Sequence, residues 1–291
     1  MGVTPEDELK TARDWAKDLV SYASIEDLER SFVQPKEPPV AICREAQNAL
    51  RVARTTALES MSSAHIINRV EKTSTGKTIT GRFTHAAQSS LRSALLFAGA
   101  GLDRSLKQLI DDTIPYLVEF EAKSAESFHK FAEDHISSGS GGIDARSLVK
   151  ILLGEGKSPK GIVLNRWSQH LQSSSAQSVE RVEEIAVALG VSNRHLRSRI
   201  KPGKADSATL KDAFLARNEI AHELDITKPK ADVRARLETL QKSRSIADIG
   251  KYVKEIIDVG QLIINDVGER LLAADYEKLL QTTWADVIKK Y

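Results

Sequence analysis

The chain is poor in the features that mark secreted, membrane-spanning and β-rich proteins. Its 291 residues include one cysteine, Cys43, which excludes an intramolecular disulfide and a cysteine-based zinc cluster. We expect this thiol to be a small buried hydrophobe in a helical segment. No apolar run approaches the roughly 20 residues that a membrane span requires. Aromatic residues make up 5% of the chain, and alternating β-branched runs, which are typical of strands, are scarce.

Charge is also nearly balanced. The formal net charge is +2, so the protein as a whole does not present the basic surface of a polyanion-binding protein. A nucleic-acid contact therefore has to come from a local patch. The first residues, Met1-Gly2-Val3-Thr4-Pro5-Glu6, are acidic and polar and do not resemble a signal peptide. With 41% hydrophobic and 28% charged residues, the composition predicts a globular cytoplasmic protein with no membrane partner.

Helical patterns run along most of the sequence and predict an all-α fold. The expected helices include one that follows Pro38-Pro39 and a strongly apolar one that continues past Pro115 to Phe120. The segment 179–189 reads as a clean helix that is stopped by Gly190, and the region from Ala231 onward reads as a long helical C-terminal part. The glycine- and serine-rich run 136–142 is typical of a loop.

One helical segment carries an anomaly, the sequence Arg217-Asn218-Glu219-Ile220-Ala221-His222. We expect the helix to begin near Asp206 or Ser207, which are good capping residues. At about 100° per residue, Arg217 lies within the apolar stripe of that helix, and Asn218 and His222 lie one turn apart at its border. The stripe itself consists of Leu210, Ala213, Phe214, Ala221 and Leu224. Burying an unpaired guanidinium costs several kcal/mol, so the helix is expected to meet an anionic group.

Plainer interpretations remain open for these residues. A single arginine on a helix face often extends its charged end to solvent or forms an ion pair, and a single histidine is often structural. The basic residues that precede the motif helix are compatible with a solvated surface or with a phosphate backbone. They are Arg194, Arg197, Arg199, Lys201 and Lys204.

Other chemistry-bearing patterns are weak. Gly76-Lys77-Thr78 matches the end of a phosphate-binding loop, but Glu71 occupies the position where that motif needs its first glycine. His129 and His135 are six residues apart, a spacing that does not suit a shared helical face. No His-Glu-x-x-His pattern occurs in the chain. The sequence therefore predicts neither a metal nor a cofactor.

The Arg217 to His222 stretch resembles the R-x4-6-H signature of the HEPN superfamily, in the form in which asparagine follows arginine. The helical chain, the apolar helix bearing Leu102-Asp103 and the long helix after the motif resemble the RiboL-PSP-type branch over residues 83–272. The resemblance implies a HEPN-like helical domain at 76–291, with 124–176 as an inserted segment and 1–75 as a helical extension. It also implies a homodimer whose motif helices meet, so that the apolar stripe around Arg217 would face a second copy of the chain.

The resemblance further implies a metal-independent endoribonuclease, of the kind found in toxin–antitoxin and antiviral-defence systems. His222 would act as general base or acid, Arg217 would hold the scissile phosphate, and Asn218 would orient the imidazole or contact the phosphate. Asp103 would pair with Arg217 in the absence of RNA. The implied partners are RNA and an antitoxin or regulatory protein. The alternatives are a non-catalytic HEPN-like module for RNA binding or dimerisation, and a helical scaffold with an internal Arg217 ion pair.

Overall fold

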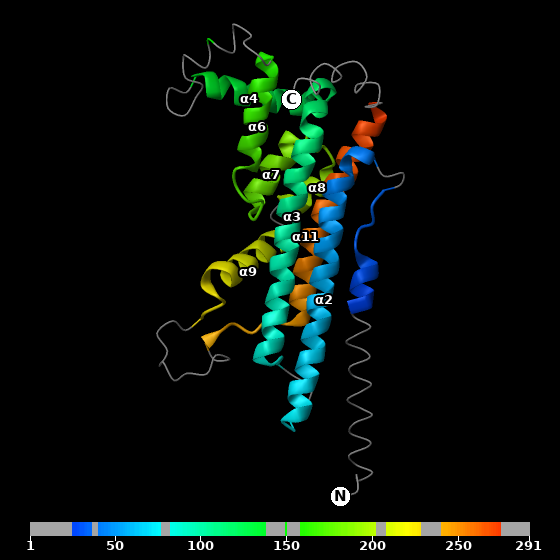
Figure 1. The fold of residues 1–291 in the computed structure, drawn as a ribbon, viewed down its shortest axis with the longest axis vertical. Coiled ribbons are helices and arrows are strands. Elements are labelled where there is room, and N and C mark those ends of the chain that lie inside the picture. The colour runs from blue at the N-terminus through cyan, green and yellow to red at the C-terminus, as the bar shows by residue number, and fades with distance from the viewer. Residues whose placement is uncertain are drawn as a thin grey trace, which may run out of the picture. The chain divides into compact units, whose positions relative to one another are not determined.

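The computed structural model describes residues 25–36, 40–76, 82–137, 149, 158–201, 208–227 and 240–274. Figure 1 shows that the elements in these ranges are helices, which confirms the predicted all-α class. The exception is one isolated antiparallel bridge between Ile226 and Gln241. None of the described helices combines the length and apolar character of a membrane span. The first 24 residues of the expected helical extension and residues 138–142 of the predicted loop lie outside the described residues, whereas residues 136–137 belong to a helix and not to a loop.

Three long helices carry most of the core. They are α2 (Arg44–Ser74), α3 (His85–Phe120) and α11 (Ile246–Ala273), and a short 3-10 turn, η1 (Ala41–Cys43), precedes α2. Pro115 lies inside α3 without ending it, as the sequence predicted. The expectation of a helix running from Ala231 is wrong for residues 241–245, which are not helical, so that α11 begins only at Ile246.

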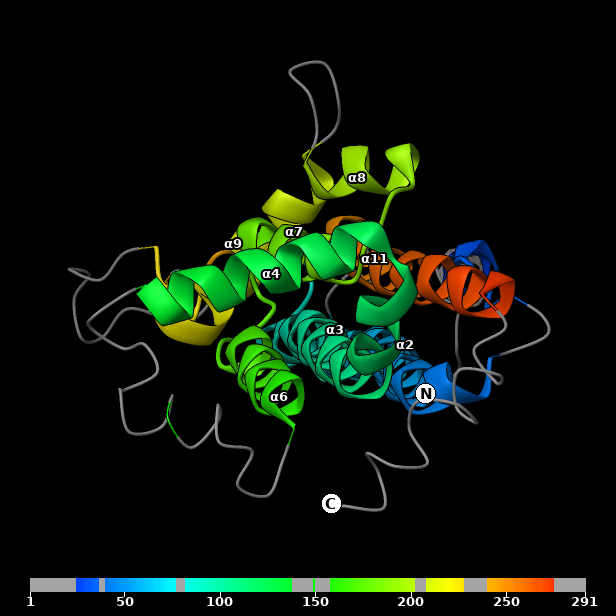
Figure 2. The same cartoon turned by 90° about the horizontal axis from the view of Figure 1, so that it is seen from above.

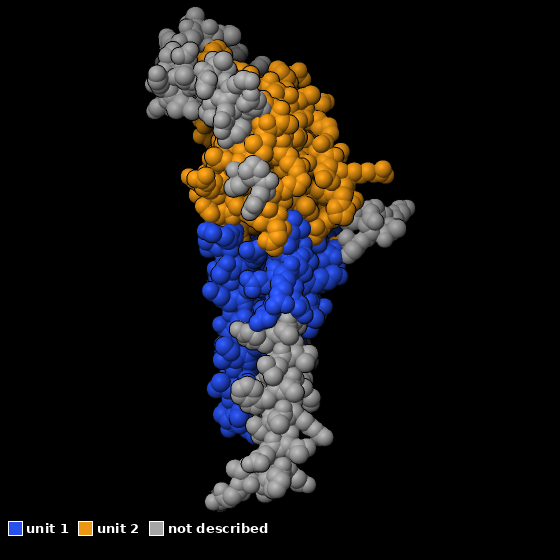
Figure 3. Space-filling model, turned by 90° about the vertical axis from the view of Figure 1, so that its right-hand side faces the viewer, with its two compact units in different colours: residues 1–33, 51–101, 209–258 blue, residues 34–50, 102–208, 259–291 orange. Residues whose placement is uncertain are grey.

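The chain divides into two compact units, coloured separately in Figure 3. Unit 1 comprises residues 1–33, 51–101 and 209–258, and unit 2 comprises 34–50, 102–208 and 259–291. Each unit is assembled from three separate stretches of chain. The expected boundary near residue 75 and the expected insertion at 124–176 stay predictions.

Within unit 1, parts of α2, α3 and α11 lie side by side (Figures 1 and 2). Gly250 of α11 allows a close approach, because a Cβ there would lie 3.2 Å from Leu28 Cδ2 and 3.3 Å from Met61 Cε. The helix that carries the motif, α9 (Thr209–Glu223), also belongs to this unit.

Within unit 2, the helices also pack tightly. A Cβ at Gly260 would lie 2.9 Å from Leu102 Cδ1 and 3.0 Å from Leu50 Cδ1, so α11 contacts α3 and α2 closely at a residue without a side chain. The buried Ser105 hydroxyl donates to the Ala46 carbonyl over 2.8 Å. Cys43 is 4% exposed, which confirms its expected burial.

Shorter helices complete unit 2. They are α4 (Ala122–Ser137), α6 (Pro159–Gln172), α7 (Val179–Ala188) and α8 (Arg194–Ile200). Figure 2 shows α4 lying next to α6 and α7, and α7 also contacts α8. The Ser178 side chain caps α7 by accepting from the Arg181 N–H. Gly190, with φ of 72°, ends that helix as the sequence predicted.

Candidate active site

The motif helix α9 buries an apolar face that surrounds Arg217. Leu210, Ala213 and Phe214 are at most 3% exposed, and Ala216 and Ile220 are 4% exposed. The interpretation that the Leu210, Ala213 and Phe214 stripe faces a second copy of the chain is therefore wrong, because these side chains pack inside the protein.

The C-terminal end of the predicted stripe also differs from the expectation. Leu224 is 62% exposed and has a φ of 52°, because it follows the last helical residue, Glu223. Ala221, placed in the same stripe, is only half-buried. The proposed caps Asp206 and Ser207 lie outside the described residues.

Arg217 is half-buried, and its side chain passes over Gly99 of α3. A Cβ at position 99 would lie 3.5 Å from Arg217 Cγ and 3.7 Å from its Nε. The absence of a larger side chain at residue 99 gives the arginine stem its path. At the end of that stem, Arg217 Nη1 donates to Asn218 Oδ1 over 3.2 Å.

His222 is exposed, whereas Asn218 is half-buried. At 100° per residue, His222 lies about 140° around the helix from Arg217, and Asn218 lies about 100° from it in the same direction. Hydrogen bonding to Asn218 therefore turns the guanidinium toward the side of the helix where the imidazole is found. The exposed Leu215 lies about 20° from His222 around the axis, so the two share one solvent-facing stripe.

A buried ionic network follows the motif helix, and sequence reasoning did not find it. The Asp225 side chain has no exposed surface. It accepts from Arg92 Nε over 2.8 Å, and from Arg244 over 2.5 Å at Nη2 and 3.2 Å at Nε. Glu219, in the middle of the motif, accepts from Arg244 Nη2 over 2.6 Å and from Lys242 Nζ over 3.0 Å. The network links the end of α9 to the segment that precedes α11, through Lys242 and Arg244.

The backbone supports the same connection. Leu224 and Asp225 both have positive φ, 52° and 57°, a region that costs most residues energy but suits aspartate better than most. The Asp225 N–H donates to the Glu219 carbonyl over 3.0 Å and so closes the helix. No local sequence signal could identify this turn, because the residues that hold it lie up to 133 positions apart.

The network also shifts ionisation equilibria. Burial disfavours the charged carboxylate of Asp225, but the hydrogen bonds and charges of Arg244 and Arg92 outweigh burial and lower its pKa below the usual value. Hydrogen bonding from Lys242, opposed by burial and assisted by Arg244, lowers the pKa of Glu219. Burial acts against the Arg244 charge, yet Asp225 and Glu219 raise its pKa above the ordinary value.

The predicted RNA-binding cations belong to α8 and its flank, in unit 2. Arg194, Arg197 and Lys201 are exposed, and Arg199 is half-buried. Lys201 Nζ lies 3.1 Å from Glu183 Oε1, and Lys204 lies outside the described residues.

Asp103 also belongs to unit 2, whereas Arg217 belongs to unit 1. Its Oδ2 forms an ion pair with Lys107 Nζ at 3.0 Å, and its Oδ1 accepts from the Ala176 N–H over 2.7 Å. The role assigned to Asp103 as a partner of Arg217 stays a prediction.

Four of the other histidines, His65, His129, His135 and His170, contact aromatic rings. The rings of Phe131 and His135 lie 3.9 Å apart, and His170 lies 5.3 Å from Phe131. Among the described residues, no group of three or more His, Cys, Asp and Glu side chains is arranged to hold a metal ion. Gly76 ends α2 with a φ of 65°, while Lys77 and Thr78 lie outside the described residues.

Comparisons with known proteins find no relationship. No family model matches the chain, and neither curated proteins nor solved structures give a match. The HEPN resemblance therefore rests on the motif and on the helical context alone.

Proposed function

We propose that the protein is a metal-independent endoribonuclease of HEPN type, with Arg217, Asn218 and His222 as its reacting and phosphate-binding residues. The observation that carries the proposal is the Arg217–Asn218 hydrogen bond. The stem of the Arg217 side chain runs along Gly99 of α3, and this hydrogen bond directs its Nη1 toward Asn218, which lies between Arg217 and the exposed His222 around the helix axis. A guanidinium and an accessible imidazole on one helix are the groups that an RNA phosphodiester needs for binding and proton transfer.

The chemistry follows from these groups. The His222 imidazole accepts the proton of the 2′-hydroxyl, and the 2′-oxygen attacks phosphorus. As the new P–O2′ bond forms, the P–O5′ bond breaks and the 5′-oxygen leaves with a proton from a second imidazole or from solvent. Arg217 stabilises the negative charge that builds on the phosphoryl oxygens. The products are a 2′,3′-cyclic phosphate and a 5′-hydroxyl, which DNA cannot give because it lacks the 2′-hydroxyl.

We propose that the homodimer forms through the exposed stripe of α9. Leu215 is 53% exposed, and together with Asn218 and His222 it forms a patch that a second copy would cover. Pairing two α9 helices there would bring two imidazoles to one cleft, one able to act as base and the other as acid. RNA as substrate and a restraining protein partner belong to the same proposal, as do a role in toxin–antitoxin or antiviral-defence systems and a cytoplasmic location.

The test is cleavage of a mixed-sequence labelled RNA in excess EDTA. We expect cleavage by the parent protein and its loss in His222→Ala and Arg217→Lys. The lysine variant keeps the positive charge but removes the paired N–H donors of the guanidinium. His129→Ala is the matched control, because His129 is also an exposed histidine but lies on α4, outside the motif.

The outcomes separate the candidate functions. A dimer that binds RNA through Arg217 without cutting it supports the non-catalytic HEPN-like module. A monomer that neither binds nor cuts RNA supports the scaffold interpretation. Equal cleavage by the parent and both motif variants places the activity elsewhere and refutes the residue assignments.

A further inference from the structure

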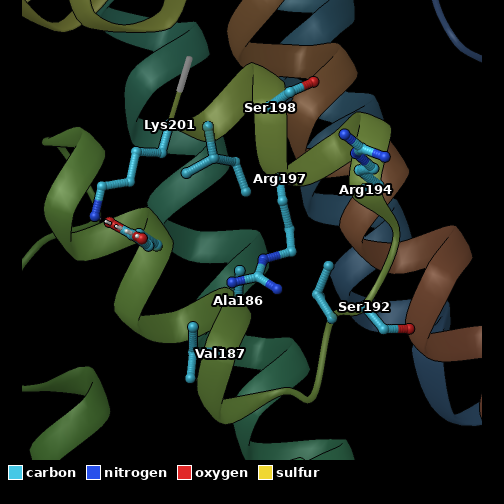
Figure 4. A pocket seen from close by; sticks show the side chains of 10 residues that line it. Ala186, Val187, Ser192, Arg194, Arg197, Ser198 and Lys201 are labelled. Atoms are coloured by element: carbon cyan, nitrogen blue, oxygen red, sulfur yellow. Dashed lines mark hydrogen bonds and ion pairs between the residues drawn. The ribbon is translucent and has the colours of Figure 1, made fainter. Parts of the chain in front are cut away.

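A pocket of about 460 Å³ lies between α7 and α8, and no motif residue lines it. Its α7 side consists of the apolar side chains of Ala186 and Val187 and the carboxylate of Glu183. Three cationic side chains, Arg194, Arg197 and Lys201, line the α8 side. Figure 4 shows Arg197 reaching from α8 toward Ala186 of α7.

The charges in this pocket are incompletely balanced. Lys201 pairs with Glu183 at 3.1 Å, the dashed contact in Figure 4. Within the part of the chain that the structure describes, no hydrogen bond or ion pair engages the guanidinium of Arg194 or Arg197. Two positive charges therefore remain uncompensated on the pocket lining.

These charges are also placed unfavourably relative to one another. Arg194 and Arg197 are three residues apart on α8, so they are neighbours on the surface of that helix. Like charges at this spacing destabilise a helix. A bound anion reduces that repulsion, and this reduction contributes to the free energy with which the anion binds.

The apolar side chains of the pocket restrict the kind of anion that fits it. Val187 is 43% exposed, although a valine ordinarily prefers burial, and it lines the same pocket as Arg197. A ligand that covers this surface needs an apolar body as well as a charged group. A phosphate monoester carries nearly two negative charges at pH 7 and three acceptor oxygens, which match two guanidinium groups.

We propose that the α7–α8 pocket binds a small phosphate monoester, with its phosphate on Arg194 and Arg197 and a compact apolar body on Val187. This inference does not rest on the proposed ribonuclease activity. Pockets of this volume are typical of small-molecule sites, which combine an apolar wall with a few polar groups.

The test is calorimetric titration of the full chain with phenyl phosphate at 0.15 M salt, beside inorganic phosphate. We expect phenyl phosphate to bind at least tenfold more tightly than inorganic phosphate. Arg194→Gln and Arg197→Gln each weaken binding about tenfold or more, whereas Arg104→Gln, which replaces an exposed arginine of α3 outside the pocket, leaves it unchanged. Val187→Ser weakens phenyl phosphate binding and spares inorganic phosphate. All four residues are exposed, so circular dichroism should show parent-like helix content.

Several results would overturn the proposal. They are equal affinity for the two probes, equal loss in the three arginine variants, and no heat of binding at millimolar phenyl phosphate. Binding of a single-stranded RNA that depends on Arg194 and Arg197, without binding of phenyl phosphate, would replace the small-ligand site with an RNA-contact surface.

Discussion

Replacing Asp225 by asparagine tests the buried network that closes the motif helix. Asparagine has nearly the same shape, keeps one acceptor oxygen and tolerates the φ of 57° at this position. The substitution therefore removes the charge while leaving the backbone turn intact. It leaves Arg92 and Arg244, whose side chains are 9% and 6% exposed, without their shared carboxylate.

Removing one partner of a buried ion pair costs about 3–5 kcal/mol. Because asparagine still accepts one hydrogen bond and Glu219 still contacts Arg244, we expect the lower end, about 3 kcal/mol. In a protein of this size that corresponds to a fall in Tm of roughly 6–12 °C. The assay is thermal and urea unfolding followed by circular dichroism.

The matched control is Asp27→Asn. The side chains of Asp27 and its partner Arg30 are 75% and 74% exposed, so this ion pair contributes less than about 1 kcal/mol. Equal unfolding free energies for the parent and Asp225→Asn would refute the stabilising role of the network.

The same pair of proteins gives a pH test. The pKa of Asp225 is lowered in the folded state, so its contribution is fully present above the unfolded value of about 3.9 and is lost as the pH falls through the folded value. The stability difference between the parent and Asp225→Asn should therefore be constant near neutrality and shrink below about pH 4. A difference that stays constant down to pH 2 contradicts the assignment.

Three further substitutions or reactions have defined outcomes. Burial and the charge of Asp112 raise the pKa of Cys43 to about 12, so Ellman's reagent at pH 8 should react with it only after denaturant is added; rapid reaction of the native protein contradicts its burial. Gly190→Ala should destabilise the fold by at least about 1 kcal/mol, because φ is 72° and a Cβ would lie 2.5 Å from Glu121 Cγ; an unchanged Tm contradicts this. Gly99→Ala should keep RNA cleavage, because its Cβ would lie at an ordinary contact distance of 3.5 Å from Arg217 Cγ. Gly99→Leu should displace the Arg217 stem and abolish cleavage. Equal activity of the two variants would contradict the assigned path of the Arg217 side chain.

The features predictable from the sequence are those set by local pattern. The all-α class, the passage of α3 through Pro115, the stop of α7 at Gly190 and the burial of Cys43 follow from periodicity and from residue type. Position 217 within the apolar face of α9 also follows from helical spacing, and the buried Leu210, Ala213 and Phe214 confirm that face.

The features that could not be predicted depend on long-range contacts. Arg92 and Asp225 are 133 residues apart, and no local signal links them. Their network includes Lys242 and Arg244, and these contacts hold a segment in which the helix expected from Ala231 is absent, residues 241–245. The prediction that the apolar stripe faces a partner copy is wrong for the same reason, because α3 of the same chain supplies Gly99 beneath Arg217.

The most direct test of the proposed function is the chemistry of the cut ends. A short RNA and the same RNA with a single 2′-deoxyribose at the preferred cleavage site are incubated with the parent protein in EDTA, and the fragments are weighed by mass spectrometry. We predict that the RNA gives 2′,3′-cyclic phosphate and 5′-hydroxyl ends and that no cut occurs at the deoxyribose. A cut at the deoxyribose, or fragments with 5′-phosphate ends, would contradict attack by the 2′-hydroxyl and with it the role of His222.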